Sequence, residues 1–234
     1  MNAFEIAALS MDVDMQRLSN IGQNLANVQT SGYKRVVTAQ RPFTDVLASA
    51  AGPDTALDMS AGPLRSSTNP LDLAVEGDGF FEFETPQGPA LSRQAMLHVD
   101  GKGRLVNDAG MPVRSERGEV RVGAETATLR VDAQGEIWAD DRSLGRLQLS
   151  RVGHPAALQA LGGGLYRPAA DDAPQLLDSP RVVSGQREGS NVSSSAEMVR
   201  LMETSRHFEA MARVVQGYDE AMDKAIRKLG DLGA

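Results

Sequence analysis

The chain has 234 residues, of which 24% are charged and 41% hydrophobic, and its formal net charge is -7. This charge argues against a nucleic-acid binder, which needs clustered Lys and Arg to neutralise phosphates. The absence of cysteine excludes disulfides, thiolate catalysis and zinc–thiolate sites. No stretch approaches the roughly 20 apolar residues that span a bilayer, so we expect no membrane insertion.

The N-terminal segment lacks the features of a cleaved signal peptide. Its first basic residue is Arg17, and Glu5, Asp12 and Asp14 interrupt any apolar run. A cleaved signal begins with a basic region and continues into an uninterrupted apolar one. We therefore expect the first residues to belong to the mature protein.

Residues 1–32 are predicted to form the first helix. Their core-facing positions are spaced alternately three and four residues apart, which is typical of the narrow apolar face of a coiled coil. Gly32 suits the left-handed position after a helix that ends near Thr30. The positions are Phe4, Ala7, Met11, Asp14, Leu18, Ile21, Leu25 and Val28.

Residues 33–68 are predicted to form an extended connector, because Thr38 to Pro70 shows no period and is rich in Ala, Ser, Gly and Pro. Residues 69–187 are predicted to form a β domain. There the period changes to two, in short segments such as "LDLAVEG", "GFFEFET" and "PALSRQAMLHVD" that are separated by turn residues.

A small repeat lies within this β region. "VDGKGRLV" from Val99 and "VDAQGEIW" from Val131 share the pattern V-D-x-x-G, which predicts two hairpins with the same turn chemistry. A calcium loop is the alternative interpretation of these aspartates. Neither turn supplies the further acidic ligands that calcium needs.

Residues 188–234 are predicted to form the second helix. Ser193 or Ser194 can cap it, and Glu197 gives an acidic first turn. The spacing of three and four residues returns over more than four heptads, and Asp219 is its polar member, as Asp14 is in the first helix. The positions are Met198, Leu201, Ser205, Phe208, Ala212, Val215, Asp219, Met222, Ile226 and Leu229.

These elements predict a mixed α and β fold. Long N- and C-terminal helices are expected to pair as a coiled coil, with a central, mostly antiparallel β domain between them in sequence. The alternative is that two amphipathic helices pack on the central domain.

No catalytic constellation is evident. His98, His154 and His207 are far apart in the sequence and form no metal-binding pair. The acidic pairs Asp140–Asp141 and Asp171–Asp172 lie in polar loops, where neighbouring carboxylates are usually solvated. We expect no catalytic activity, no cofactor and no metal.

Three blocks resemble the flagellar basal-body rod family of bacteria. They are "NLANVQTSGYKR" (24–35), "NPLDLAVEGDGFFEFETPQG" (69–88) with "LSRQAMLHVDGKGRLVNDAGMPV" (91–113), and "EGSNVSSSAEMVRLMETSRHFEA" (188–210). They occur in the family's order and include both ends of the chain. "METSRHFEAMARVV" is similar to the member in the proximal rod, and the distal-rod member is the alternative.

The resemblance implies a self-assembling structural subunit of the rod, which crosses the periplasm and transmits torque from the motor to the hook. It implies contact with other copies and with proximal and distal rod proteins, and export by the flagellar type III apparatus without cleavage. Terminal helices would pair in an inner tube. The predicted assembly interface consists of Phe4, Met11, Leu18, Ile21, Leu25, Val28, Met198, Leu201, Phe208, Val215, Met222, Ile226 and Leu229.

Three asparagines lie beside the apolar face of the first helix. Asn20, Asn24 and Asn27 occupy positions i, i+4 and i+7, hence one flank of the helix. In a tube of like helices their amides could hydrogen-bond neighbouring subunits. The alternative is a solvated polar face. Other function classes remain open on the sequence alone, namely a secreted peptidoglycan-cleaving enzyme and an adhesin or effector that uses the same secretion route.

Overall fold

The computed structural model describes residues 3–38 and 55–231 of the chain. Two helices lie at its ends, α1 (Ala3–Ala26) and α3 (Ser194–Asp231). By their contacts the residues divide into a helical unit, which comprises residues 1–26, 36–56 and 193–234, and a β unit, which comprises residues 27–35 and 57–192. Residues 39–54 of the predicted connector lie outside the described residues, and the four-part division predicted from sequence stays a prediction.

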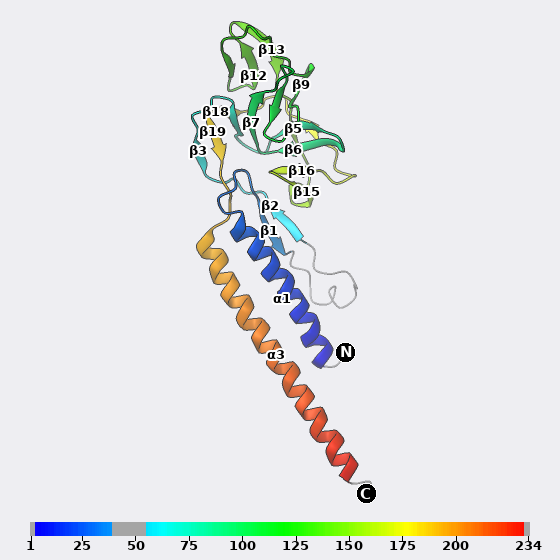
Figure 1. Cartoon of the computed structure of the whole chain (residues 1–234). Coiled ribbons are helices and arrows are strands. Elements are labelled where there is room, and N and C mark those ends of the chain that lie inside the picture. Colours follow the sequence, from blue (N-terminus) through cyan, green and yellow to red (C-terminus); the bar gives the residue numbers. More distant parts are fainter. Residues whose placement is uncertain (1–2, 39–54, 232–234) are drawn as a thin grey trace. The chain divides into compact units, whose positions relative to one another are not determined.

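Short strands make up most of the region between the helices (Figure 1). In chain order they are β1 (Arg35–Thr38), β2 (Thr55–Asp58), β3 (Leu64–Ser66), β4 (Asp72–Val75), β5 (Phe80–Thr85), β6 (Gly88–Ser92), β7 (Gln94–Val99), β8 (Leu105–Asn107), β9 (Arg114–Ser115), β10 (Gly118–Glu119), β11 (Leu129–Val131), β12 (Glu136–Ala139), β13 (Arg142–Arg146), β14 (Leu149–Arg151), β15 (Gln159–Gly162), β16 (Leu165–Arg167), β17 (Gln175–Leu176), β18 (Val182–Ser184) and β19 (Gln186–Glu188). A 3₁₀ turn, η1 (Pro155–Ala157), precedes β15.

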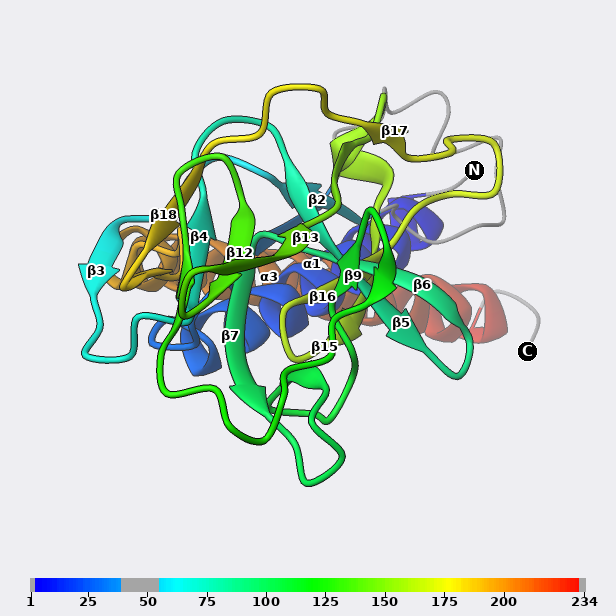
Figure 2. The same ribbon diagram turned by 90° about the horizontal axis from the view of Figure 1, so that it is seen from above.

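The β unit is built around two sheets, of order β15-β16-β6-β5-β14-β17 and β18-β4-β7-β8. Their strand pairs are antiparallel. Smaller sheets join β11-β12-β13, β9 with β10 and β3 with β19, and β1 pairs with β2. Figure 2, a view from above, shows β5 and β6 side by side, as their pairing requires.

The core of the β unit comes from residues that the period of two singled out. Phe81 and Phe83 alternate on β5 and are 0% and 1% exposed, whereas β4 is buried along its whole length. Leu97, Leu105 and Ile137 complete the centre of this cluster. The first four residues of β5, Phe80 to Phe83, are all buried, as β4 is, so both strands are buried on both faces there. Alternation in the sequence therefore located β5 but did not separate a core side from a solvent side.

The two repeated turns adopt the same structure. Asp100 Oδ1 accepts the backbone N–H groups of Lys102 and Arg104, both at 2.8 Å. Asp132 Oδ1 accepts those of Gln134 and Glu136, at 3.0 and 2.9 Å. The glycine of each repeat has a positive φ, as these tight turns require. Both turns close hairpins, β7–β8 and β11–β12.

The predicted coiled coil of two long terminal helices is wrong. The structure has one long helix, α3, of 38 residues, and a shorter α1 of 24 residues. They contact each other, but on α3 the predicted apolar face is largely exposed at Met198, Met222 and Ile226. A coiled coil needs apolar residues at both positions of the repeat on both helices.

Polar side chains occupy the helix–helix contact instead. On α3 the buried position near its start is Glu197, one residue before the predicted Met198. On α1, Asp14 and Asn24 are 1% and 2% exposed, beside buried Ala7 and Ile21. The buried α1 residues Ala7, Asp14 and Ile21 occupy positions of the predicted spacing, whereas on α3 Met198 and Ile226 occupy such positions and are exposed.

Candidate assembly interface

Among the described side chains of α3, seven large apolar ones are exposed. Most are about half exposed, and Ile226 reaches 62%. Soluble monomers rarely expose apolar side chains in such number on one element, and such surfaces usually mark protein contacts. The residues are Met198, Val199, Leu201, Met202, Val214, Met222 and Ile226.

The remaining predicted interface residues have mixed exposure. Ile21 is buried, at 6%, and Phe4 is 39% exposed. The side chain of Leu229 lies outside the described ones. Half-buried positions are Met11, Leu18, Leu25, Val28, Phe208 and Val215. Their part in contacts with other subunits stays a prediction, because these burial values describe one chain.

The three asparagines bond within the chain. Asn24 Oδ1 accepts the N–H of Val36 at 2.9 Å, and Asn24 Nδ2 donates to Val36 O at 2.8 Å and to Glu197 Oε2 at 3.5 Å. Asn20 Nδ2 donates to Thr38 Oγ1 at 3.3 Å, and Asn27 Oδ1 accepts from Thr30. Their predicted bonds to neighbouring subunits stay a prediction.

A polar cluster that spacing did not predict lies in the helical unit. His207 Nδ1 is 2.5 Å from Asp14 Oδ2, and Arg17 Nη1 is 3.5 Å from Asp14 Oδ1. Asp14 is buried, so its carboxylate depends on these partners. The polar position within the apolar repeat of α1 was the available signal, but nothing in the sequence identified His207 as the partner.

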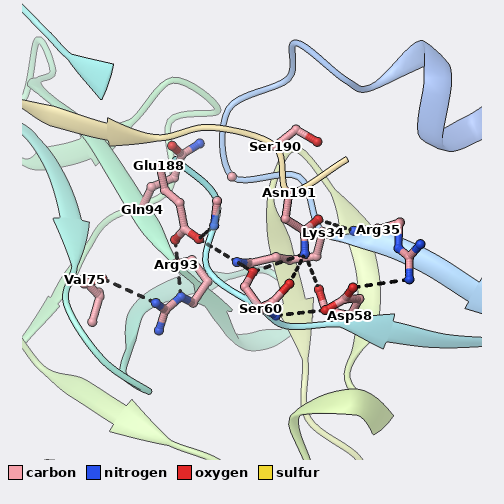
Figure 3. A network of polar contacts seen from close by, with 12 residues as sticks. Lys34, Arg35, Asp58, Ser60, Val75, Arg93, Gln94, Glu188, Ser190 and Asn191 are labelled. Carbon is pink, nitrogen blue, oxygen red and sulfur yellow. Dashed lines mark hydrogen bonds and ion pairs between the residues drawn. The ribbon is translucent and has the colours of Figure 1, made fainter. Parts of the chain in front are cut away.

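A second buried network joins the two ends of the β unit's chain (Figure 3). Lys34 Nζ is 2.6 Å from Glu188 Oε1, and Arg93 Nε is 3.4 Å from Glu188 Oε2. The side chains are 0%, 5% and 2% exposed for Lys34, Arg93 and Glu188. Burial lowers the pKa of Lys34, and the carboxylate of Glu188 opposes that shift. Two quoted sequence blocks, 24–35 and 188–210, thus meet through this ion pair.

The backbone reinforces this connection. Gly32 N donates to Glu188 O at 2.7 Å, and the Tyr166 hydroxyl donates to Gly32 O at 3.0 Å. Burial raises the pKa of that hydroxyl, which keeps it a donor. Gly32 has φ +68, and a Cβ there would lie 2.7 Å from Gln94 Nε2. The positive φ therefore favours glycine at this position, and any larger residue would also require the Gln94 side chain to move.

Charged side chains are few around the cavity of the β unit. A cavity of about 970 Å³ in the β unit is lined by one carboxylate, that of Asp108, and one guanidinium, that of Arg187. Within the described ranges no three His, Asp or Glu side chains gather to hold a metal ion. Among those same residues no helix has the length and apolar character to cross a membrane.

Comparison with known proteins gives matches along nearly the whole chain. Residues 74–139 match the flagellar hook protein FlgE/F/G D1 domain, and residues 183–228 match the flagellar basal body rod FlgEFG protein C-terminal family. The rod protein FlgF of Caulobacter vibrioides is 26% identical over 96% of each chain, and that of Escherichia coli is 29% identical over 94% of each. FlgG of Borreliella burgdorferi is 26% identical over 95% of this chain and 96% of its own.

These matches agree with the residues that the structure brings together. The C-terminal model includes Glu188, Asn191 and most of α3, and the D1 model covers Arg93 and the core strands β5 to β8. The three relatives are all named as flagellar basal-body rod proteins. Over nearly its whole length the chain is similar to flagellar basal-body rod proteins.

Proposed function

We propose that this protein is a structural subunit of the flagellar rod, at the position of FlgF in the proximal part. The observation that carries the proposal is the exposed apolar surface of α3, together with the similarity of the chain to rod proteins. Apolar side chains of this size gain free energy by burial, at roughly 25 cal/mol per Å². A neighbouring subunit would cover them in the assembled rod.

Alignment lengths support FlgF rather than FlgG. Alignments with the FlgF relatives extend over 234–242 positions, close to the length of this chain. Those with the FlgG relatives extend over 256–259 positions, so they require gaps in this chain. A FlgG role is the second candidate, because its relatives match with similar identity.

The mechanism is mechanical. Subunits would repeat along a helical assembly, and contacts among their helices and β units would resist twisting while torque passes from the motor to the hook. Its partners would be other copies and neighbouring rod proteins. We further propose that the flagellar type III apparatus exports the chain without cleavage and that the rod lies in the periplasmic space.

Purified basal bodies test this function. The protein should remain in detergent-extracted basal bodies, and deletion of its gene should leave cells without hooks and without motility. Electron microscopy of labelled basal bodies separates the two positions, since FlgF would lie nearer the motor than FlgG. Recovery of the protein only in the medium would contradict the proposal. A zymogram on cell wall checks the enzymatic alternative and should show no clearing.

A further inference from the structure

The chain passes between the helical unit and the β unit at four places, after Ala26, Arg35, Ala56 and Val192. These passages are the covalent connections through which force can travel from one unit to the other. Each passage is a single stretch of backbone. Its φ and ψ angles are the soft dihedrals of the chain, so a passage without side-chain contacts is flexible. Side chains that hold several passages together would make them act jointly.

In the β unit, Asn191 hydrogen-bonds residues beside two of these passages and itself lies beside a third. Its Oδ1 accepts the N–H of Arg35 at 2.8 Å, and its Nδ2 donates to Asp58 O at 2.7 Å and to Ser60 O at 3.1 Å. Arg35 is the last residue before one passage, Asp58 follows another by two residues, and Asn191 itself precedes the fourth. Figure 3 shows Asn191 between Arg35 and Asp58, whose side chains also form an ion pair at 3.4 Å.

In the helical unit, Asn24 has the corresponding place. It bonds both the N–H and the C=O of Val36, the first residue after a passage, and it donates to Glu197 near the start of α3. Asn24 itself lies two residues before the passage that follows Ala26. Its side chain is 2% exposed, so water cannot replace these bonds.

Only a primary amide supplies these bonds. Its oxygen accepts and its nitrogen donates in one plane, whereas a carboxylate of the same size only accepts. Aspartate at position 191 would keep the bond from Arg35 N and place an oxygen against the carbonyl of Asp58. Aspartate at position 24 would likewise face Val36 O and the carboxylate of Glu197.

We infer that Asn24 and Asn191 are positioning residues for load transfer. Each links, within its own unit, the residues that flank several of the passages, so that these backbone connections share the torque. The inference rests on the proposed rod function. It assigns to the two asparagines a role that apolar packing cannot fill, because apolar side chains offer backbone groups neither a donor nor an acceptor.

The test compares Asn24→Asp and Asn191→Asp with Asn107→Asp. Asn107 Oδ1 only accepts, from Ala109 N and Met111 N, so aspartate can replace it without loss. Amide exchange of the purified chain should become about tenfold faster at Arg35 and Val36 in the first two variants and stay unchanged in the control. In cells the first two variants should lose several-fold more hooks and filaments under shear. Equal behaviour of all three variants would overturn the inference.

Two further variants keep the test decisive. Asn24→Asp combined with Glu197→Gln removes the repulsion between the two carboxylates. It does not restore the hydrogen bond donated to Val36 O, so amide exchange at Arg35 and Val36 should stay fast. Full recovery would assign the effect to a buried charge and overturn the inference. If Asn191→Asp does not fold, Asn191→Ser, which is too short for the three bonds and adds no charge, replaces it with the same expected result.

The assay also separates this inference from the proposed function. Wild-type amounts of each variant in detergent-extracted basal bodies would leave the rod function intact, and an unchanged exchange rate would then overturn only the role of the asparagines. Absence of the wild-type protein from basal bodies would contradict the rod function while the exchange rates still measure the bonds.

Discussion

At the scale of single residues, the chain places charge where most proteins place apolar groups. Glu188 lies between Lys34 and Arg93, and all three are almost fully buried. Arg93 also donates to the backbone oxygens of Gly77 and Gly79, at 2.5 and 2.6 Å. Such a network tolerates the desolvation of its charges only while every partner is present.

Replacing Glu188 by glutamine should therefore destabilise the β unit strongly. The change leaves Lys34 and Arg93 buried without an anion, which costs about 3–5 kcal/mol in comparable sites. Urea unfolding followed by circular dichroism measures the loss. The control is Glu116→Gln, whose pair with Arg146 at 3.8 Å is well exposed and should contribute less than about 1 kcal/mol. A loss as small as that of the control would contradict the structural role of Glu188.

The Asp132 turn should make stability depend on acid pH. Burial raises the pKa of Asp132, but donation from Glu136 N, Trp138 Nε1 and Gln134 N lowers it further, to below the ordinary 3.8. Between the lowered pKa of the folded chain and the ordinary 3.8 of the unfolded chain, the unfolded chain binds more protons. The stabilisation by the ionised Asp132 is therefore complete above pH 3.8 and is lost as the pH falls through the folded pKa.

Asp132→Asn should flatten the decline of unfolding free energy in that acid range. Urea unfolding at a series of pH values measures the slope, and Asp141→Asn, which removes an exposed carboxylate nearby, is the control. A slope identical to that of the wild-type chain would refute the contribution of the Asp132 turn.

At the scale of elements, α3 continues beyond its contact with α1. The ring of Phe4, near the start of α1, is 6.0 Å from that of Tyr218. Met222 and Ile226 follow Tyr218 at intervals of four residues and so extend the same face of the helix. They are 46% and 62% exposed.

Ile226→Asp should abolish incorporation into rods without unfolding the chain. The side chain is exposed in the monomer, so the substitution costs little there, whereas a charge within a packed contact costs several kcal/mol. Lys224→Asp, on the opposite face of α3, is the matched control and should assemble. Circular dichroism of the purified chains and their amount in basal bodies give the two measurements. Normal rods from Ile226→Asp would remove this face from the interface.

Sequence patterns predicted some of these elements and not others. Alternation found β5 with its buried Phe81 and Phe83, and the V-D-x-x-G repeat found two hairpins, because local chemistry determines both. The partners Lys34 with Glu188 and Asp14 with His207 were beyond prediction, since each depends on residues more than 150 positions apart. The error on α3 had a different cause. Some apolar residues of α3 are half-buried and others are exposed. A pattern of apolar residues cannot distinguish a contact within the chain from a contact with another subunit.

At the scale of the whole molecule, each unit is built from segments that are far apart in the chain. Residues 27–35 group with the β unit although they follow α1, and the helical unit combines α1 with α3. Contacts of high sequence separation therefore close both units, and the β unit depends on residues near its own two ends.

Two truncations test this dependence. A chain of residues 1–192 retains Glu188 and Asn191, and its β unit should unfold cooperatively. A chain of residues 1–187 lacks the anion for Lys34 and Arg93 and should show weak, non-cooperative unfolding with rapid proteolysis. The two truncated chains differ chiefly in whether they contain Glu188. Glu188→Gln in the chain of residues 1–192 should therefore reproduce much of the weak, non-cooperative unfolding of the shorter chain. Equal stability of the two truncated chains would contradict the closing role of residues 188–192.

The pairing of Lys34 with Glu188 also determines when the β unit can close during biosynthesis. A polypeptide emerges with its N-terminus first, so Lys34 is present long before its anion. Until residue 188 follows, closing the β unit would bury the ammonium group without a counter-charge, and the incomplete chain stays open instead. A chain that stalls before residue 188 should therefore remain open and accessible to proteases, and the ion pair would make closure of the β unit conditional on a nearly complete chain.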